Sequence, residues 1–260
     1  MNIMFSFDQL LEEVGDYYSL LDVPVDQDFR FNQKEHIFLI DEGSMLAYGG
    51  KDPVTGIKAT QTFGQHDPIG FAEAITGREM SLTFRKLSDL RLRVFQSKEV
   101  KKQVNSAKIF SQTIIKYSLS RIFDHKRVNQ YFSFEDEFIA KNHGFLKRVR
   151  IAKGDDIFRI KEQATKMFFI EKGAVGILSR TSKQIAELGL GECFGESAML
   201  SDLQRRYTAV ANKDSTLLLI DQATVEKQMA LDTPLVRLIV LILLKRLELM
   251  NRLRMVKDRG

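Results

Sequence analysis

The chain has 260 residues, of which 44% are apolar and 28% are charged. This composition is typical of a globular protein with one large domain or two of ordinary size. Because 39 basic and 34 acidic residues leave a formal net charge of only +5, the chain lacks the general positive charge of a protein that coats nucleic acid. Its single cysteine, Cys193, excludes an intrachain disulfide and fits a reducing cytoplasm.

The N-terminal residues 1–22 carry neither the basic start nor the small-residue cleavage site of a secretory signal. Their pattern predicts an amphipathic, acidic helix. The longest apolar run, Leu235 to Leu244, contains Arg237 and is about half the length that a bilayer requires. We therefore expect a cytoplasmic protein without a membrane segment.

Both halves of the chain show the same order of predicted elements. In the first half, strand patterns precede a long helical pattern at 101–123. In the second half, strand patterns precede a short helix at 223–230 and a long helix at 235–256. The predicted strand regions of the two halves lie at 29–50, 57–75 and 81–95, and at 145–160, 167–178, 185–200 and 207–220.

The repeat can be followed residue by residue. Phe38 to Gly43 align with Phe168 to Gly173 at an offset of 130 residues, and Gly70 aligns with Gly195 at an offset of 125. The difference of five residues lies in a hairpin insertion around 49–53. This register predicts two copies of one domain, at 1–126 and 127–260.

The residues of one strand connection, Gly191 to Ala211, suggest a specific chemistry. Gly195 leaves room for the backbone, and Glu196 offers a hydrogen-bond acceptor at the start of a short helical pattern. The amides that open this helix favour an anion, and the pair Arg205 and Arg206 supplies positive charge. The segment predicts a site for a small anion that carries a sugar.

An ordered series of motifs in the second half resembles a known family. The series consists of KGDDIF at 153–158, a hairpin glycine within 167–178, FGESAML at 194–200 and an arginine before the TAV of 208–210. It resembles the cyclic nucleotide-binding domain of catabolite-activator-type regulators and of regulatory subunits of cAMP-dependent protein kinase, over about residues 134–260. The resemblance implies an α+β fold with two tandem β-rolls (double-stranded β-helix or jelly roll), each with flanking helices, and a long C-terminal helix.

The resemblance also implies the roles of single residues. Glu196 would accept a hydrogen bond from the ribose 2′-hydroxyl, and an arginine would pair with the cyclic phosphate. Spacing to Val210 favours Arg206 for that role, whereas a shorter cassette would favour Arg205. The expected ligand-binding residues are Gly195, Glu196, Ser197, Ala198, Arg205, Arg206 and Tyr207, with Ile177 and Ile185 packing against the base.

The first half lacks these side chains at the aligned positions. Phe71 stands where Glu196 does, and Met80 and Ser81 stand where the two arginines do. A phenyl ring cannot accept a hydrogen bond from a hydroxyl, and neither methionine nor serine carries a counter-charge for a phosphate. We therefore expect a degenerate copy that contacts a partner or the other half.

These observations predict a non-catalytic receptor. The histidines show no metal-ligand spacing, so neither a metal nor enzymatic activity is expected. The 40 residues after Ile220 are accounted for by two helices, so no DNA-binding domain is expected either.

We predict a cytoplasmic receptor for cAMP, favoured over cGMP, that signals to a separate protein partner by movement of its C-terminal helix. A homodimer through that helix is plausible from the resemblance. The alternative is a structural module that binds no ligand and is built from two relic folds.

Overall fold

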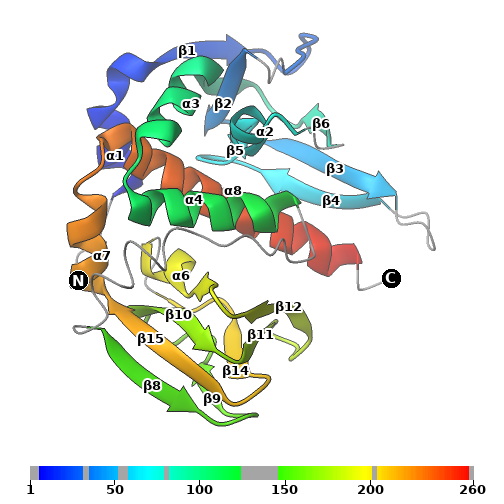
Figure 1. Ribbon diagram of the computed structural model, residues 1–260. Helices are drawn as coiled ribbons and strands as arrows, with labels where there is room; N and C mark the ends of the chain where they lie inside the picture. Colours follow the sequence, from blue (N-terminus) through cyan, green and yellow to red (C-terminus); the bar gives the residue numbers. More distant parts are fainter. Residues whose placement is uncertain are drawn as a thin grey trace. The chain divides into compact units, whose positions relative to one another are not determined.

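The computed structural model describes residues 6–31, 35–51, 58–78, 82–123, 146–200 and 204–257. It is an α+β protein whose strands pair antiparallel (Figure 1). Contacts divide the chain into two compact units. One unit comprises Met1–Gln9, Lys108–Tyr117 and His125–Asp232, and the other comprises Leu10–Ala107, Ser118–Asp124 and Thr233–Gly260. The long C-terminal helix thus groups with the first half of the chain, although the sequence assigns it to the domain at 127–260.

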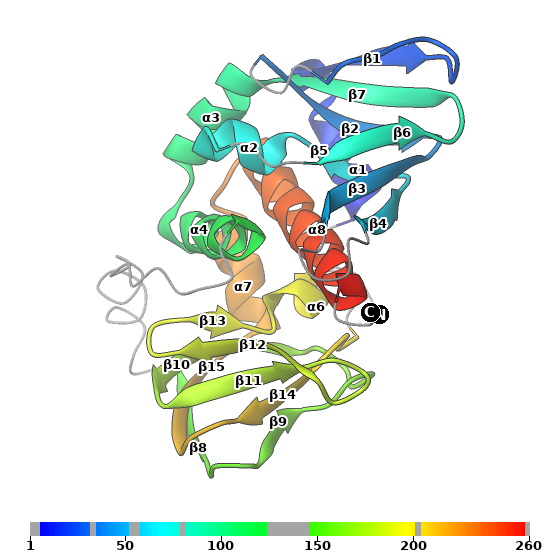
Figure 2. The same ribbon diagram turned by 90° about the vertical axis from the view of Figure 1, so that its right-hand side faces the viewer.

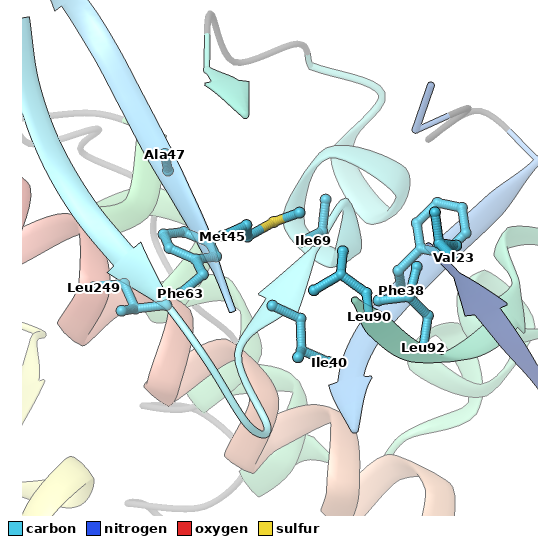
Figure 3. Packing of buried hydrophobic residues seen from close by; sticks show 10 residues of the cluster. All are labelled: Val23, Phe38, Ile40, Met45, Ala47, Phe63, Ile69, Leu90, Leu92 and Leu249. Atoms are coloured by element: carbon cyan, nitrogen blue, oxygen red, sulfur yellow. The ribbon is translucent and has the colours of Figure 1, made fainter. Parts of the chain in front are cut away.

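The first roll, a name we give to strands β1 to β7, consists of two antiparallel sheets. One sheet has the order β1-β7-β2-β5 and the other the order β4-β3-β6. The strands are β1 (Tyr18–Val23), β2 (His36–Glu42), β3 (Met45–Lys51), β4 (Lys58–Phe63), β5 (Pro68–Ile69), β6 (Thr83–Lys86) and β7 (Leu90–Gln96). A cluster of buried apolar side chains from both sheets forms the core of this roll (Figure 3).

Two predicted helices of the first half differ from the observed ones. The N-terminal helix α1 ends early, at Phe7–Glu13, and after a 3-10 turn at Gly15–Tyr17 the chain continues as strand β1, which pairs with β7. The predicted helix at 101–123 is two helices, α3 (Ser97–Ser106) and α4 (Ile109–Phe123). The break places the Lys108 backbone N–H 2.7 Å from a carboxylate oxygen of Asp232, which caps the start of α4.

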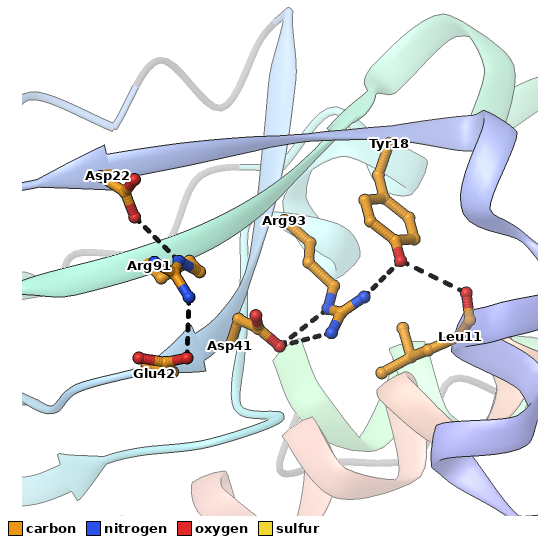
Figure 4. A network of polar contacts seen from close by, with 7 residues as sticks. All are labelled: Leu11, Tyr18, Asp22, Asp41, Glu42, Arg91 and Arg93. Carbon is orange, nitrogen blue, oxygen red and sulfur yellow. Dashed lines mark hydrogen bonds and ion pairs between the residues drawn. The ribbon is translucent and has the colours of Figure 1, made fainter.

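Arginine networks attach β1 to the first roll (Figure 4). Arg91 of β7 donates to Asp22 of β1 and to Glu42 of β2, each at 2.9 Å. Arg93 of β7 donates to Asp41 at 3.0 Å and to the hydroxyl of Tyr18. The Arg91 pairs are exposed and contribute little to stability, so their role is to fix the register of β1 on β7.

The second roll, strands β8 to β15, also consists of two antiparallel sheets (Figure 2). Their orders are β13-β10-β15-β8 and β12-β11-β14-β9. The strands are β8 (Lys147–Ile151), β9 (Asp156–Phe158), β10 (Lys166–Lys172), β11 (Ala174–Leu178), β12 (Gln184–Gly189), β13 (Cys193–Phe194), β14 (Thr208–Ala211) and β15 (Ser215–Asp221). Helix α6 (Glu196–Leu200) follows β13, and α7 (Gln222–Met229) and α8 (Pro234–Lys257) confirm the two helices predicted after β15.

Strand pairing in the two rolls follows the predicted offsets. Phe38 of β2 pairs with Ile69 and Val94, and Phe168 of β10 pairs with Phe194 and Leu219. In both rolls the register of this central strand then shifts, at Ile40/Glu42 and at Ile170/Lys172. The aligned residues therefore have the same strand partners in each roll.

A glycine after each of these shifts is required by its surroundings. Gly43 and Gly173 have φ angles of 91° and 98°. A Cβ atom at Gly43 would lie 2.0 Å from the carbonyl oxygen of Asp89, and one at Gly173 would lie 2.2 Å from Oγ of Ser215. Any side chain would clash at either position, so both glycines belong to the framework that the rolls share.

Candidate functional site

The cassette of the second roll begins with a turn at Gly195. This glycine has a φ of 85° and connects strand β13 to helix α6. A Cβ atom at this position would lie 2.8 Å from Nη1 of Arg205. Glycine is therefore needed here for its backbone conformation and for the space that it leaves to the arginine.

Arg205 is fixed beside this turn by both its side chain and its backbone. The residue is only 4% exposed, and its Nη1 donates to the carbonyl oxygen of Gly195 at 2.7 Å while its Nη2 donates to that of Lys166. The guanidinium carbon lies 4.1 Å from the ring centroid of Phe158. The backbone N–H of Arg205 donates to the carbonyl of Glu162 at 2.8 Å. The guanidinium is thus positioned before any ligand arrives.

Burial changes the acid–base behaviour of Arg205. It lowers the pKa of Arg205 to about 10, although the carboxylates of Glu196 and Glu162 act in the opposite direction. The side chain still carries its charge at neutral pH. Its Nε is buried and has no hydrogen-bond acceptor among the described residues. A buried cation with an unused donor favours the binding of an anion, which would supply both the acceptor and the counter-charge.

Glu196 brings the opposite charge to the same site. It is the first residue of α6 and is 5% exposed. The next residues of the helix, Ser197 and Ala198, are half-buried and buried. A carboxylate would repel an anion at this place, so its oxygens suit a hydroxyl donor. The site combines an anion-binding group with a hydroxyl-binding group.

The structure places Arg205 at the cassette, although spacing favours Arg206. Residues 204 and 205 pair with the segment at 162–163, through the bridge of Gln163 with Gln204 and the N–H bond to Glu162. The paired Arg205 is buried, whereas Arg206 and Tyr207 lie in a bend that leads into strand β14. Arg206 and Tyr207 are both half-buried. The spacing to Val210 does not reveal this because it cannot show which side chain is buried.

The two predicted base-packing isoleucines lie in different surroundings. Ile177 pairs with Ala186 and Ala209 and packs against the apolar cluster of the second roll. Ile185 is half-buried and falls where the pairing of β11 and β12 shifts register. The cluster that Ile177 joins comprises Phe158, Phe168, Ile170, Val175, Leu188, Phe194, Ala209 and Leu217.

Several contacts of Arg205 were not predicted from the sequence. Phe158 and Phe168 lie beneath the guanidinium, at 4.1 and 5.8 Å from its carbon, and the carbonyl of Lys166 accepts one of its hydrogen bonds. Phe158 ends the KGDDIF motif, so the motif contained this signal. The carbonyl of Lys166 carries no signal in the sequence, because any residue could provide it.

The first roll has the same turn without the charged groups. Gly70 has a φ of 85° and precedes helix α2 (Phe71–Thr76). Phe71, in the place of Glu196, is 1% exposed, and its ring centroid lies 5.5 Å from that of Phe95. Met80 and Ser81 lie outside the described residues. At the position of Glu196 the first roll therefore has an apolar contact between two aromatic rings.

The described residues were also compared with what a metal site and a membrane-spanning helix require. Within the described residues, no group of three or more histidine, cysteine, aspartate or glutamate side chains is arranged to hold a metal ion. In the same part of the chain, no helix has the length and apolar character needed to cross a membrane.

Comparisons with known proteins place the second roll in a family. The family description "Cyclic nucleotide-binding domain" matches residues 148–232, which include the whole cassette with Glu196 and Arg205. The second roll is a cyclic nucleotide-binding domain. This finding confirms the resemblance drawn from the motifs.

Relatives of the cyclic nucleotide-binding domain include kinase regulators. The cAMP-dependent protein kinase regulatory subunit of Eremothecium gossypii is 32% identical over 79 residues, which cover 30% of this chain and 17% of that protein. The cGMP-dependent protein kinase of Eimeria tenella is 39% identical over 67 residues, 26% of this chain and 7% of that protein. The cAMP-bound form of the EAL enzyme Bd1971 is 32% identical, covers 39% of this chain and 28% of that chain, and has a TM-score of 0.37. This chain spans less than a quarter of the length of these curated relatives.

Proposed function

We propose that the protein is a cyclic nucleotide receptor that binds one nucleotide, cAMP in preference to cGMP, in its second roll. The observation that carries the proposal is the buried Arg205, which is fixed beside Gly195 and whose Nε has no acceptor in the described part of the chain. A cyclic phosphodiester carries one negative charge, which suits one guanidinium. We further propose that the chain acts by binding and not by catalysis.

Each residue of the site has a proposed role. Arg205 pairs with the cyclic phosphate, with help from backbone amides of Gly195, Ser197 and Ala198. The Glu196 carboxylate accepts a hydrogen bond from the ribose 2′-hydroxyl. In this role its negative charge faces a hydroxyl and not the phosphate. Ile177, which is half-buried on β11 beside the apolar cluster, packs against the base in this proposal.

The output of the receptor is a further part of the proposal. One relative is a regulatory subunit of a cAMP-dependent protein kinase, and another is a cGMP-dependent protein kinase. By analogy, the receptor would signal to a protein partner, and we place it in the cytoplasm. Helix α8 follows directly after the residues that the family matches, and we propose it as the element that passes the signal on. A homodimer through α8 remains a prediction.

Calorimetric titration of the full chain with cAMP and with cGMP tests the site. Arg205→Met should weaken binding by roughly 100-fold or more, because it leaves a buried phosphate without its charged donor. Arg206→Met is the matched control, since it removes the same charge one residue away, and we expect a change of less than about threefold. Equal losses in the two variants, or none in either, would contradict the proposal.

The alternative function, a structural module without ligand, is favoured by one observation. The central strand β2 of the first roll keeps its pairing with β5 and β7 although Phe71 replaces the carboxylate, so this pairing does not require the carboxylate. A thermal unfolding screen separates the two functions. A receptor gains roughly 2.7 kcal/mol of stability at a nucleotide concentration of a hundred times the dissociation constant, whereas the melting temperature of a structural module stays unchanged.

A further inference from the structure

We propose that the first roll is a binding site for a cationic helix, and that its occupant is the segment 241–250 of helix α8. The recognition pair is Glu73 of α2 and Arg246 of α8, supported by Leu249. The site would take a largely apolar helix that presents an arginine and, three residues later, a leucine. This proposal concerns a different roll from the nucleotide site and does not depend on it.

The ion pair at the centre of this site is buried. Nη2 of Arg246 lies 2.9 Å from Oε1 of Glu73, and the two side chains are 2% and 6% exposed. Glu73 belongs to α2, the helix that follows the left-handed Gly70 and so corresponds to α6 of the second roll. Its aligned residue there is Ala198. Helices α2 and α6 occupy corresponding positions in the two rolls. Helix α6 lies beside the buried Arg205, whereas α2 carries a carboxylate that pairs with an arginine.

Leu249 supplies the apolar part of the recognition. It stands three residues after Arg246 and therefore lies on the same side of α8. Leu249 is 3% exposed and joins the cluster of the first roll that contains Met45, Ala47 and Phe63 (Figure 3). These three residues align with Val175, Ile177 and Leu188, of which Ile177 is the proposed base-packing residue. Leu249 thus packs on first-roll positions whose second-roll counterparts belong to, or pack against, the apolar cluster of that roll.

Charge complementarity at the edge of the site identifies the same occupant. Nζ of Lys245 lies 2.8 Å from the carbonyl oxygen of Gln65 and 3.4 Å from a carboxylate oxygen of Asp67. Lys245 is one-third exposed, so this contact lies nearer to solvent than the pair of Glu73 with Arg246. Two acidic residues of the first roll therefore face two consecutive basic residues of α8. This match explains why an arginine is buried there at all.

The buried ion pair gives the contact specificity. Removing two charges from water is costly, and their mutual attraction repays that cost only while both partners are present. Removing Arg246 leaves the Glu73 carboxylate buried without this partner, and Glu73→Gln takes this carboxylate from Arg246, so either change favours opening of the helix. Removing both charges should be tolerated much better, because no charge then remains buried.

Hydrogen exchange of the full chain, followed by mass spectrometry without nucleotide, tests the proposal. In Glu73→Gln and in Arg246→Met, we expect the amides of 241–250 to exchange at least roughly 100-fold faster, whereas strands β10 and β15 of the second roll keep their rates. The double variant Glu73→Gln/Arg246→Met should exchange more slowly than the product of the two single effects predicts. Lys245→Met, the matched control on the same helix, should change the rates by less than about threefold.

Three results would overturn the proposal. The first is that the amides of 241–250 exchange at an unchanged rate in both single variants. The second is that Lys245→Met accelerates exchange as much as Arg246→Met does. The third is that the double variant accelerates exchange by the product of the two single effects. If Arg246→Met does not fold, Glu73→Gln, which keeps the shape of the side chain, gives the comparison with Lys245→Met. Nucleotide titration of Glu73→Gln should still reveal binding that depends on Arg205, so failure here is distinguishable from failure of the nucleotide site.

Discussion

The two rolls of this protein share a framework and differ in what it holds. Their central strands pair in the same register, and each has left-handed glycines at both aligned positions, Gly43 and Gly70 in one and Gly173 and Gly195 in the other. The difference begins one residue after the second glycine, where Phe71 replaces Glu196. The comparison indicates that pairing and glycines determine the fold, and that a few side chains of the cassette determine which ligand it takes.

The largest expected effect comes from placing the second roll's carboxylate in the first. Phe71→Glu should destabilise the protein by about 4 kcal/mol, because it removes a buried ring and buries a charge without a partner. Phe71→Leu, the control, should cost about 1.5 kcal/mol. Urea unfolding measures both. If Phe71→Glu were as stable as the control and gained a nucleotide site, the first roll would be a receptor that lacks only one residue.

A smaller effect is expected at the glycine that the second roll needs for its arginine. Gly195→Ala should lower nucleotide affinity by roughly tenfold, because a Cβ atom 2.8 Å from Nη1 displaces the Arg205 side chain. Gly154→Ala in the same roll also places an alanine at positive φ, 93°, but its Cβ atom has no neighbour within 4 Å. Titration of both variants separates the two causes. Equal losses of affinity would mean that backbone strain alone is responsible.

The smallest effect concerns pH. Burial lowers the pKa of Arg205 to about 10, and a bound phosphate would favour the charged form, so binding should raise this pKa. Affinity should therefore be constant from pH 7 to 9 and fall by roughly tenfold per unit once the pH exceeds 10.

The lowered pKa of Arg205 also makes the free energy of unfolding depend on pH, and this dependence has the opposite sign to that of nucleotide affinity. The folded protein holds this proton less tightly than the unfolded chain, so the stability contribution of Arg205 rises with pH above 10. Arg205→Met should remove both dependences, and a loss of nucleotide affinity below pH 9 would contradict the assignment of the phosphate to this residue.

Much of the fold could be predicted from the sequence because its signals are local or repeated. The aligned glycines and the strand patterns are read directly from the chain, and the helices predicted at 223–230 and 235–256 are observed at Gln222–Met229 and Pro234–Lys257. Strand β1 was missed because residues 18–23 become a strand only through pairing with β7. The break between α3 and α4 was missed for a similar reason, since the cap on α4 comes from Asp232.

The sites were less predictable because burial and distant contacts decide them. Glu196 was proposed from the cassette and stays a prediction, and which of the adjacent arginines is buried depends on the pairing with the segment at 162–163. Glu73 and Arg246 are separated by 173 residues, and nothing in the local pattern of either residue indicates the other. The sequence predicted that the first roll lacks a nucleotide site, while its proposed occupant became visible only in the folded chain.

The central claim is that the second roll alone binds a cyclic nucleotide, through Arg205. The most direct test is the stoichiometry of a calorimetric titration of the full chain with cAMP, repeated with cGMP and with Arg205→Met. We predict one nucleotide per chain in the natural protein and no binding in Arg205→Met at the same concentrations. Two nucleotides per chain, or one that persists in Arg205→Met, would contradict the account.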